Sequence, residues 1–235
     1  MKITLAQINT VVGDIEGNTK KIISIIKNAK SDIVVFPELS IIGYSPQDLL
    51  LKKSFIEKNL EALEGIALQT RNKAAIVGFI QKKYNGLYNS AVVINDRKII
   101  KIHNKICLPN YTIFDEKRWF KEGNEATVFE LHKKKIGLSI CEDIWFPETT
   151  KAQGKKGAEL IINISASPYR KGKLETIENV LKQRWIENRL PIAYINLVGA
   201  QDGIVYYGHS MFFDKGKIIA KCNDFEEGIK TIEIK

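Results

Sequence analysis

The stretch that decides the fold is IGLSICEDIW, residues 136–145. Its first five residues, Ile136 to Ile140, are mostly apolar and typical of a short buried strand. Cys141 follows directly, where the chain leaves the strand and a turn frees backbone amides. A thiol placed there can act as a nucleophile whose oxyanion those amides stabilise. The same pattern also allows Cys141 to be a small buried apolar residue, the usual role of an unpaired cysteine.

Two other segments place a charged side chain at the end of a strand. Residues 32–38, DIVVFPE, predict an apolar strand that ends in Glu38, and sheet proteins bind ligands beyond strand ends. The alternative for Glu38 is a solvent-facing strand terminus or a cap for the next segment. In KIHNKICLPN, residues 101–110, Lys105 follows an alternating strand. A lysine there can supply fixed positive charge to an anion and keep a neighbouring thiolate ionised.

The rest of the chain alternates between strand and helix patterns. Runs rich in β-branched residues predict strands at Ile3–Ile8, Ile33–Phe36, Ala74–Ile80, Ser90–Ile94, Ile136–Ile140, Leu160–Ile164, Ile192–Leu197 and Ser210–Asp214. Apolar residues at helical spacing predict helices over 17–30, 53–70 and 174–190. Turns at Asn95-Asp96 and Lys215-Gly216 predict hairpins, and residues 228–235 predict a closing strand. We therefore expect an α/β fold with mixed sheets covered by helices.

Length and composition fit one soluble domain over residues 1–235. The chain is 44% hydrophobic, and neither a Pro/Gly/Ser-rich linker nor an apolar stretch of membrane-spanning length interrupts it. The net charge is +9, but the basic residues are mostly scattered lysines without interleaved aromatic residues, so we expect no nucleic-acid partner. The three cysteines form no C-x-x-C pair, which argues against a disulfide framework or a zinc site. We expect a cytoplasmic protein that does not bind membranes.

Taken together, the three segments resemble the nitrilase superfamily of carbon-nitrogen hydrolases. FPE at 36–38, K-x-x-L-P at 105–109 and C-E-D-I-W at 141–145 have the order and approximate spacing of that superfamily's Glu-Lys-Cys triad. Longer segments are similar to the glutaminase domain of glutamine-dependent NAD+ synthetases: GYSPQDLLL at 43–51, LPNYTIFDEKRWFKEG at 108–123 and NISASPYRKGK at 163–173. The resemblance implies a four-layer α-β-β-α sandwich of two mixed sheets flanked by helices.

The resemblance also implies roles for individual residues. Cys141 would attack a glutamine carboxamide, Glu38 would act as general base, and Lys105 with the Glu142 backbone amide would stabilise the oxyanion, without a metal or organic cofactor. Glu122 would be a second carboxylate that orients the lysine and the thiol. The residues implied to contact the substrate are Tyr44, Tyr111, Glu142, Ser167 and Lys173.

The sequence departs from the subfamily at Lys173, where some members are expected to have an arginine. A lysine binds a carboxylate as a point charge instead of a bidentate fork, so its contact with the substrate is less directional than that of an arginine. Residues 200–203 and 206–210 also depart from the subfamily pattern. We interpret the three histidines, His103, His132 and His209, as structural or surface residues.

Three functions follow from the resemblance. The first is a glutaminase that supplies ammonia to an ammonia-dependent NAD+ synthetase on another chain or in a missing domain, since the Ser-Gly-Gly-type pyrophosphate loop of the synthetase is absent. The second is a free-standing amidase, ω-amidase or carbamoyl hydrolase that acts on another small amide. The third is a non-catalytic scaffold with the same fold. Relatives usually dimerise or form larger assemblies, so we expect a homo-oligomer.

Overall fold

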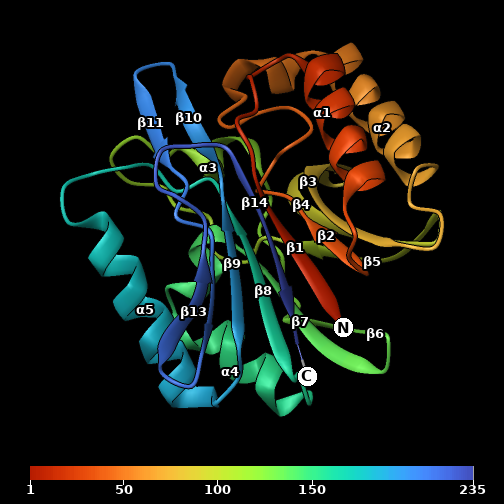
Figure 1. Ribbon diagram of the computed structural model, residues 1–235. Helices are drawn as coiled ribbons and strands as arrows, with labels where there is room; N and C mark the ends of the chain where they lie inside the picture. The colour runs from red at the N-terminus through yellow and green to blue at the C-terminus, as the bar shows by residue number, and fades with distance from the viewer. Residues whose placement is uncertain (235) are drawn as a thin grey trace.

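The computed structural model describes residues 1–234 and contains two six-stranded sheets packed face to face. The first sheet has the order β14-β1-β2-β3-β4-β5, and the second has the order β13-β12-β9-β8-β7-β6. Both are mixed, because parallel pairs such as β1 with β2 and β7 with β8 stand beside antiparallel pairs such as β3 with β4. A small antiparallel pair, β10 with β11, projects beyond the sheets (Figure 1).

The strands of the first sheet are β1 (Lys2–Gln7), β2 (Ile33–Val35), β3 (Ala74–Lys83), β4 (Gly86–Asn95), β5 (Lys98–Asn104) and β14 (Gly228–Glu233). Those of the second are β6 (Thr127–Leu131), β7 (Lys134–Ile140), β8 (Leu160–Ser165), β9 (Ile192–Asn196), β12 (Met211–Asp214) and β13 (Lys217–Lys221). The projecting pair comprises β10 (Val198–Gln201) and β11 (Ile204–Tyr207).

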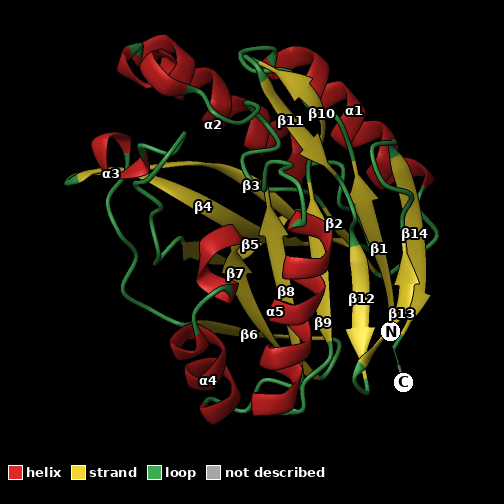
Figure 2. Ribbon diagram, turned by 90° about the vertical axis from the view of Figure 1, so that its left-hand side faces the viewer, coloured by secondary structure: helices red, strands yellow, loops and turns green. Residues whose placement is uncertain are grey.

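Helices cover the outer face of each sheet (Figures 1 and 2). Helices α1 (Ile15–Asn28) and α2 (Lys53–Ala67) lie over the first sheet, while α4 (Pro147–Lys155) and α5 (Lys173–Asn188) lie over the second. The remaining helical segments are short: η1 (Gln47–Leu51), α3 (Glu116–Trp119) and η2 (Cys141–Ile144). The expected four-layer α-β-β-α sandwich is therefore confirmed.

The apolar pattern of the strands explains why both faces of each sheet are buried. Along β2, Ile33 and Val35 belong to the core between the sheets, whereas Val34 packs in the core under α1 and α2. In β8, Ile162 faces the first sheet and Ile161 packs with residues of α5. Because side chains alternate along a strand, a strand buried on both faces has an almost continuous apolar sequence.

Both predicted hairpins are present, but one of the two turns lies at a different pair of residues. The turn between β4 and β5 is made by Asp96 and Arg97, with φ of 44° and 67°, one residue later than predicted. The turn at Lys215-Gly216, with φ of 51° and 77°, joins β12 to β13 as predicted. Two-residue hairpin loops favour such positive φ because their twist matches that of the strands. The predicted closing strand is β14, and Lys235 at its end lies outside the described residues.

Within residues 1–234, no helix combines the length and apolar character needed to cross a membrane.

Candidate active site

Glu38 follows β2 and turns into the interior, where it is 1% exposed. Its Oε1 accepts hydrogen bonds from Lys105 Nζ at 2.6 Å and from Asn89 Nδ2 at 2.7 Å, and its Oε2 accepts from the Ala166 backbone N–H at 2.8 Å. Donors from several parts of the chain thus fix both carboxylate oxygens. A buried carboxylate held this way has a defined position and keeps lone pairs for a proton transfer.

Lys105 follows β5, and its side chain is fully buried between two carboxylates. The ammonium donates to Glu38 Oε1 at 2.6 Å and to Glu116 Oε1 at 2.7 Å. Burial opposes the charged form, but the negative charges of Glu116 and Glu38 outweigh it and hold the pKa of Lys105 well above its usual range. Lys105 is therefore a fixed cation in the interior.

Cys141 is the first residue after β7, and its φ of 43° lies in the left-handed region that non-glycine residues rarely adopt. The thiol is 5% exposed. Burial, followed by the charge of Glu38, raises the pKa of the Cys141 thiol well above its usual range, while Lys105 acts in the opposite direction. The resting thiol is therefore neutral and needs a base to become a nucleophile. Glu38, Lys105 and Cys141 share one buried region at the ends of their strands.

The structure places Glu116, and not Glu122, beside this group. Glu122 lies on the surface with its side chain 55% exposed and pairs with Lys117 at 3.0 Å, so the prediction that it orients the lysine and the thiol is wrong. Glu116 is buried and accepts hydrogen bonds at Oε1 from Lys105 and from Tyr44 Oη. Burial is the main cause that raises the pKa of Glu116 to about 7, against the lowering effect of Lys105.

The sequence contains a weak signal for Glu116 that the motif comparison missed. Glu116 starts α3 and stands one turn before buried Phe120, whose N–H donates to the Glu116 carbonyl. Glu122 follows exposed Lys121 in a segment that forms neither helix nor strand. A carboxylate one helical turn from a buried aromatic residue shares its inward face. Asn89, which contacts Glu38, carried no comparable signal, because its position beside Glu38 depends on the pairing of β4 with β3.

A pocket of about 430 Å³ lies beside the group of Glu38, Lys105 and Cys141. It is lined by Tyr111, Thr112, Ile113, Phe114, Trp145, Pro168, Tyr169, Arg170 and Lys173. The Lys173 ammonium lies 3.8 Å from the centre of the Trp145 ring, and the Tyr111 hydroxyl donates to Glu142 Oε1 at 2.8 Å. Three of the predicted substrate-binding residues, Tyr111, Glu142 and Lys173, therefore gather at this pocket.

The other two predicted substrate-binding residues are buried and bound to protein groups. The Tyr44 hydroxyl donates to Glu116 Oε1 at 2.6 Å, which makes Tyr44 a partner of the carboxylate that holds Lys105. The Ser167 N–H donates to Asn196 Oδ1 at 2.7 Å, and Ser167 immediately precedes Pro168 of the pocket lining. Direct contact of Tyr44 and Ser167 with a substrate stays a prediction.

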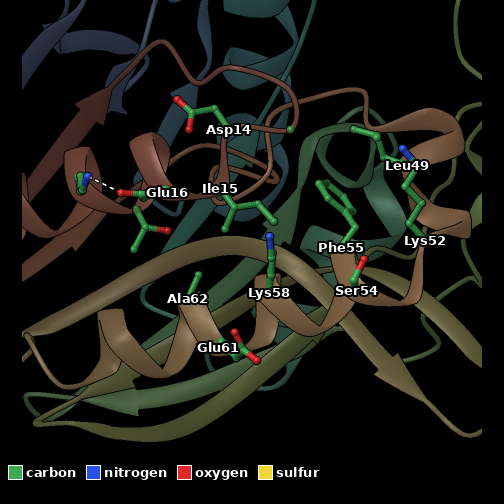
Figure 3. A pocket seen from close by; sticks show the side chains of 13 residues that line it. Asp14, Ile15, Glu16, Leu49, Lys52, Ser54, Phe55, Lys58, Glu61 and Ala62 are labelled. Carbon is green, nitrogen blue, oxygen red and sulfur yellow. Dashed lines mark hydrogen bonds and ion pairs between the residues drawn. The ribbon is translucent and has the colours of Figure 1, made fainter.

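A separate groove of about 740 Å³ lies between α1 and α2 (Figure 3). It is lined by charged side chains of both signs, among them Glu16, Lys58 and Glu61, around the apolar side chains of Ile15 and Phe55. None of the predicted site residues lines it. Its lining contains neither a cysteine nor a histidine. In the part of the chain that the structure describes, no group of three or more His, Cys, Asp or Glu side chains is arranged to hold a metal ion.

Comparison with known proteins links this arrangement to a family. The carbon-nitrogen hydrolase family model matches residues 2–235. A glutamine-dependent NAD(+) synthetase from Aquifex aeolicus is 43% identical over 239 residues, covering 100% of this chain and 42% of the relative. A glutamine-dependent NAD(+) synthetase from Thermotoga maritima is 42% identical over 242 residues, again covering 100% and 42%. The chain thus spans less than half the length of these curated relatives.

Solved structures agree on the fold. The chain is similar to glutamine-dependent NAD+ synthetase from Acinetobacter baumannii in complex with ADP, with a TM-score of 0.94 and 34% identity over 98% of this chain and 44% of that one. An amidase of the nitrilase superfamily from Nesterenkonia superposes with a TM-score of 0.90 at 23% identity, over 100% of this chain and 90% of that one. The sandwich is therefore common to both groups of proteins.

Proposed function

The chain belongs to the carbon-nitrogen hydrolase family, and from this premise we propose that it hydrolyses the side-chain amide of glutamine and releases ammonia. The observation that carries the proposal is the buried Lys105 ammonium, bound by Glu38 and Glu116 in the region that holds Cys141. The relatives with the most extensive similarity described above are glutamine-dependent. The first fact supports hydrolysis of an amide, and the second supports glutamine as the substrate.

The proposed reaction begins with the neutral Cys141 thiol. Glu38 removes the thiol proton as Sγ attacks the carboxamide carbon, and the negative charge moves to the amide oxygen. Lys105 and the Glu142 backbone N–H stabilise this tetrahedral oxyanion. Fixed donors aimed at developing charge stabilise a transition state because they need no reorganisation when the charge appears.

The amide nitrogen must be protonated in the next step, because it leaves only in its protonated form. Glu38 returns the proton to the nitrogen, the carbon–nitrogen bond breaks, and ammonia departs from a glutamyl thioester on Cys141. A water molecule then gives a proton to Glu38 and attacks the thioester carbon. The carbon–sulfur bond breaks, the sulfur regains the proton, and glutamate is released.

Recognition of glutamine is assigned to the pocket beside Cys141. Lys173 would bind the α-carboxylate as a point charge, and its pKa is lowered mainly by burial. Tyr111 and Glu142, already hydrogen-bonded to each other, would contact the polar groups of the substrate backbone. The aromatic walls at Phe114 and Trp145 would enclose its methylene groups.

The ammonia would be consumed by an ammonia-dependent NAD+ synthetase. This partner is proposed because the chain covers 42% of relatives whose names describe glutamine-dependent NAD(+) synthetases. Residues 1–235 would form one glutaminase-like domain that works beside the synthetase, in a homo-oligomer. A cytoplasmic location suits the free thiols of Cys107, Cys141 and Cys222, because reducing compartments keep cysteines unpaired.

The test is an ammonia-release assay with glutamine, asparagine, other ω-amides and carbamoyl compounds. We expect glutamine to give the highest kcat/KM. Cys141→Ala should lower kcat by a factor on the order of 10⁴, because nucleophile and base act as a unit. Cys222→Ala is the control, since Cys222 is a similarly buried cysteine outside the group. Preference for another amide, or equal activity of both variants, would refute the proposal.

A further inference from the structure

Asp143 is a fully buried carboxylate two residues after Cys141. Its Oδ1 accepts hydrogen bonds from the backbone N–H groups of Ile106, at 2.9 Å, and Cys107, at 2.8 Å. Its Oδ2 accepts from the Ile140 N–H at 2.9 Å and lies 2.9 Å from His103 Nε2. One side chain therefore has four hydrogen-bond partners.

These four partners belong to the two segments that carry the thiol and the ammonium. Ile140 precedes Cys141 directly. His103 lies two residues before Lys105, and Ile106 and Cys107 follow it. Asp143 itself lies in η2 beside the second sheet, whereas His103 belongs to β5 of the first sheet. Asp143 thus joins the two sheets at the point where each contributes a reacting group.

Both carboxylate oxygens of Asp143 accept hydrogen bonds from backbone N–H groups. The three backbone N–H groups can only donate, so both oxygens of Asp143 must accept. With Nε2 protonated, His103 donates the fourth hydrogen bond to Asp143. Its Nδ1 lies 3.0 Å from Thr127 Oγ1, which can donate in return. Thr127 begins β6, whose partner strand β7 leads to Cys141, so His103 extends the connection to the nucleophile's own sheet.

We propose that Asp143, supported by His103, is a positioning residue that sets the location of the Lys105 ammonium relative to the Cys141 sulfur. The proposal rests on the proposed amide hydrolysis and adds a residue that touches neither substrate nor reacting atoms. Nucleophilic attack and oxyanion stabilisation need these two groups in a fixed relation, and a displacement of about 1 Å can lower the rate about 10²-fold.

The variant that tests the proposal is Asp143→Asn. The asparagine has the same shape, but its NH₂ group must face a donor, either Ile140 N–H or the N–H groups of the Lys105 segment. We expect kcat per folded molecule to fall about 10²-fold with KM unchanged, since the pocket for the substrate is untouched. Asp32→Asn is the matched control, because Asp32 also accepts a backbone N–H, from Lys2 at 2.7 Å.

A second pair of variants tests the support from His103. In His103→Gln the amide nitrogen can take the place of Nε2 and still donate to Asp143, so kcat should stay close to that of the unchanged protein. In His103→Leu the donor is lost, and kcat should fall in the same direction as in Asp143→Asn. If Asp143→Asn fails to fold, this pair decides: equal kcat in His103→Gln and His103→Leu would refute the proposal.

Alkylation of Cys141 by iodoacetamide, followed by mass spectrometry at several pH values, provides a readout that does not depend on glutamine. We expect Asp143→Asn to change the rate or the pH profile of alkylation, and Asp32→Asn to leave both unchanged. A loss of thermal stability with kcat and alkylation unchanged would show a purely structural role and overturn the proposal. If the unchanged protein fails to hydrolyse glutamine, the proposed function fails, while the alkylation comparison still tests the role of Asp143.

Discussion

Lys105 binds Glu38 and Glu116 through one oxygen of each carboxylate, at 2.6 Å and 2.7 Å. A single ammonium shared by two carboxylates neutralises neither completely. Glu116 therefore shares with Glu38 the task of holding the ammonium in place. In this way Glu116 supports Lys105 without touching the thiol.

Replacing Glu116 by Gln is expected to lower kcat/KM by a factor on the order of 10² or more, since Lys105 loses one of the two carboxylates that fix the position of its ammonium. Glu122→Gln, the same change six residues later on the surface, should leave kcat/KM within experimental error. Steady-state ammonia release measures both. Equal activity of the two variants would show that Glu116 is not the carboxylate that supports Lys105 in the reaction.

The pKa of Glu116, raised to about 7 mainly by burial, also predicts a pH dependence. As the pH falls through about 7, Glu116 gains a proton and Lys105 loses one of the two carboxylate charges that hold its ammonium in place. The kcat/KM of the unchanged protein should therefore decrease on the acid side of about 7. In Glu116→Gln this acid limb should disappear from the pH profile. A limb that persists unchanged would assign the titration to another group.

The segments of the proposed triad could be predicted from the sequence because each follows a strand pattern, and strand ends define where side chains can meet. The companions of the triad could not. Glu116 and Glu122 lie in the same charged stretch, and only the orientation of α3 turns the first inward. Asn89 contacts Glu38 because β4 crosses beside it, and that depends on the pairing of β4 with β3 and β5.

At the scale of secondary structure, β3 determines where Glu38 lies. Gly78 of β3 packs so closely that a Cβ at this position would lie 2.2 Å from Leu39 N, 2.5 Å from Pro37 O and 2.7 Å from Glu38 C. All three are backbone atoms, which cannot move aside as the end of a flexible side chain can. The glycine therefore permits the close approach that places the Glu38 carboxylate.

Gly78→Ala is expected to displace residues 37–39, lower kcat strongly and destabilise the fold by about 1–3 kcal/mol, as overpacking does. Gly65→Ala is the control, because a Cβ in that helical position of α2 would meet no atom within 4 Å. Alanine there should stabilise the protein by about 0.5–1 kcal/mol. Urea denaturation and ammonia release measure both effects. Unchanged kcat in Gly78→Ala would show that the Glu38 segment adapts to the added methyl group.

Elements with strong apolar periodicity were predicted, and elements without it were missed. Helices over 17–30, 53–70 and 174–190 correspond to α1, α2 and α5 with shifts of a few residues at their ends. Helix α4, PETTKAQGK, was missed because its buried side chains are Thr149, Thr150 and Gln153, which give no apolar stripe. Strand β6 was missed because its turn, His132-Lys133, carries no glycine or asparagine.

At the scale of the whole molecule, the site exists only when the two sheets pack together. Glu38 and Lys105 follow strands of the first sheet, β2 and β5, while Cys141 follows β7 of the second. The strand patterns in the sequence do not indicate which strands share a sheet, because this depends on long-range pairing such as that of β1 with β14. Local sequence patterns specify that a strand forms, whereas the packing of the assembled core determines which strands pair with it.

His209 connects three parts of the second half of the molecule. It precedes β12, its Nδ1 lies 2.6 Å from Asp224 Oδ1 between β13 and β14, and its Nε2 lies 2.9 Å from Glu178 Oε1 in α5. The ring is almost fully buried. The backbone φ of 62° restricts the residues that fit without strain, and asparagine is among those that tolerate this region.

His209→Asn should therefore preserve the backbone conformation but lose the reach to both carboxylates. We expect it to lower the free energy of unfolding by about 1.5–3 kcal/mol, the range for hydrogen bonds to charged groups. His132→Asn is the matched control, since His132 has a similar φ of 51° and is exposed in a turn; its effect should stay within about 0.5 kcal/mol. Urea titrations of the three proteins provide the comparison. Equal stability of the two variants would mean that solvent replaces both carboxylate contacts without cost, and that α5 is held to the second sheet by its apolar side chains, such as Ile177 and Leu181, alone.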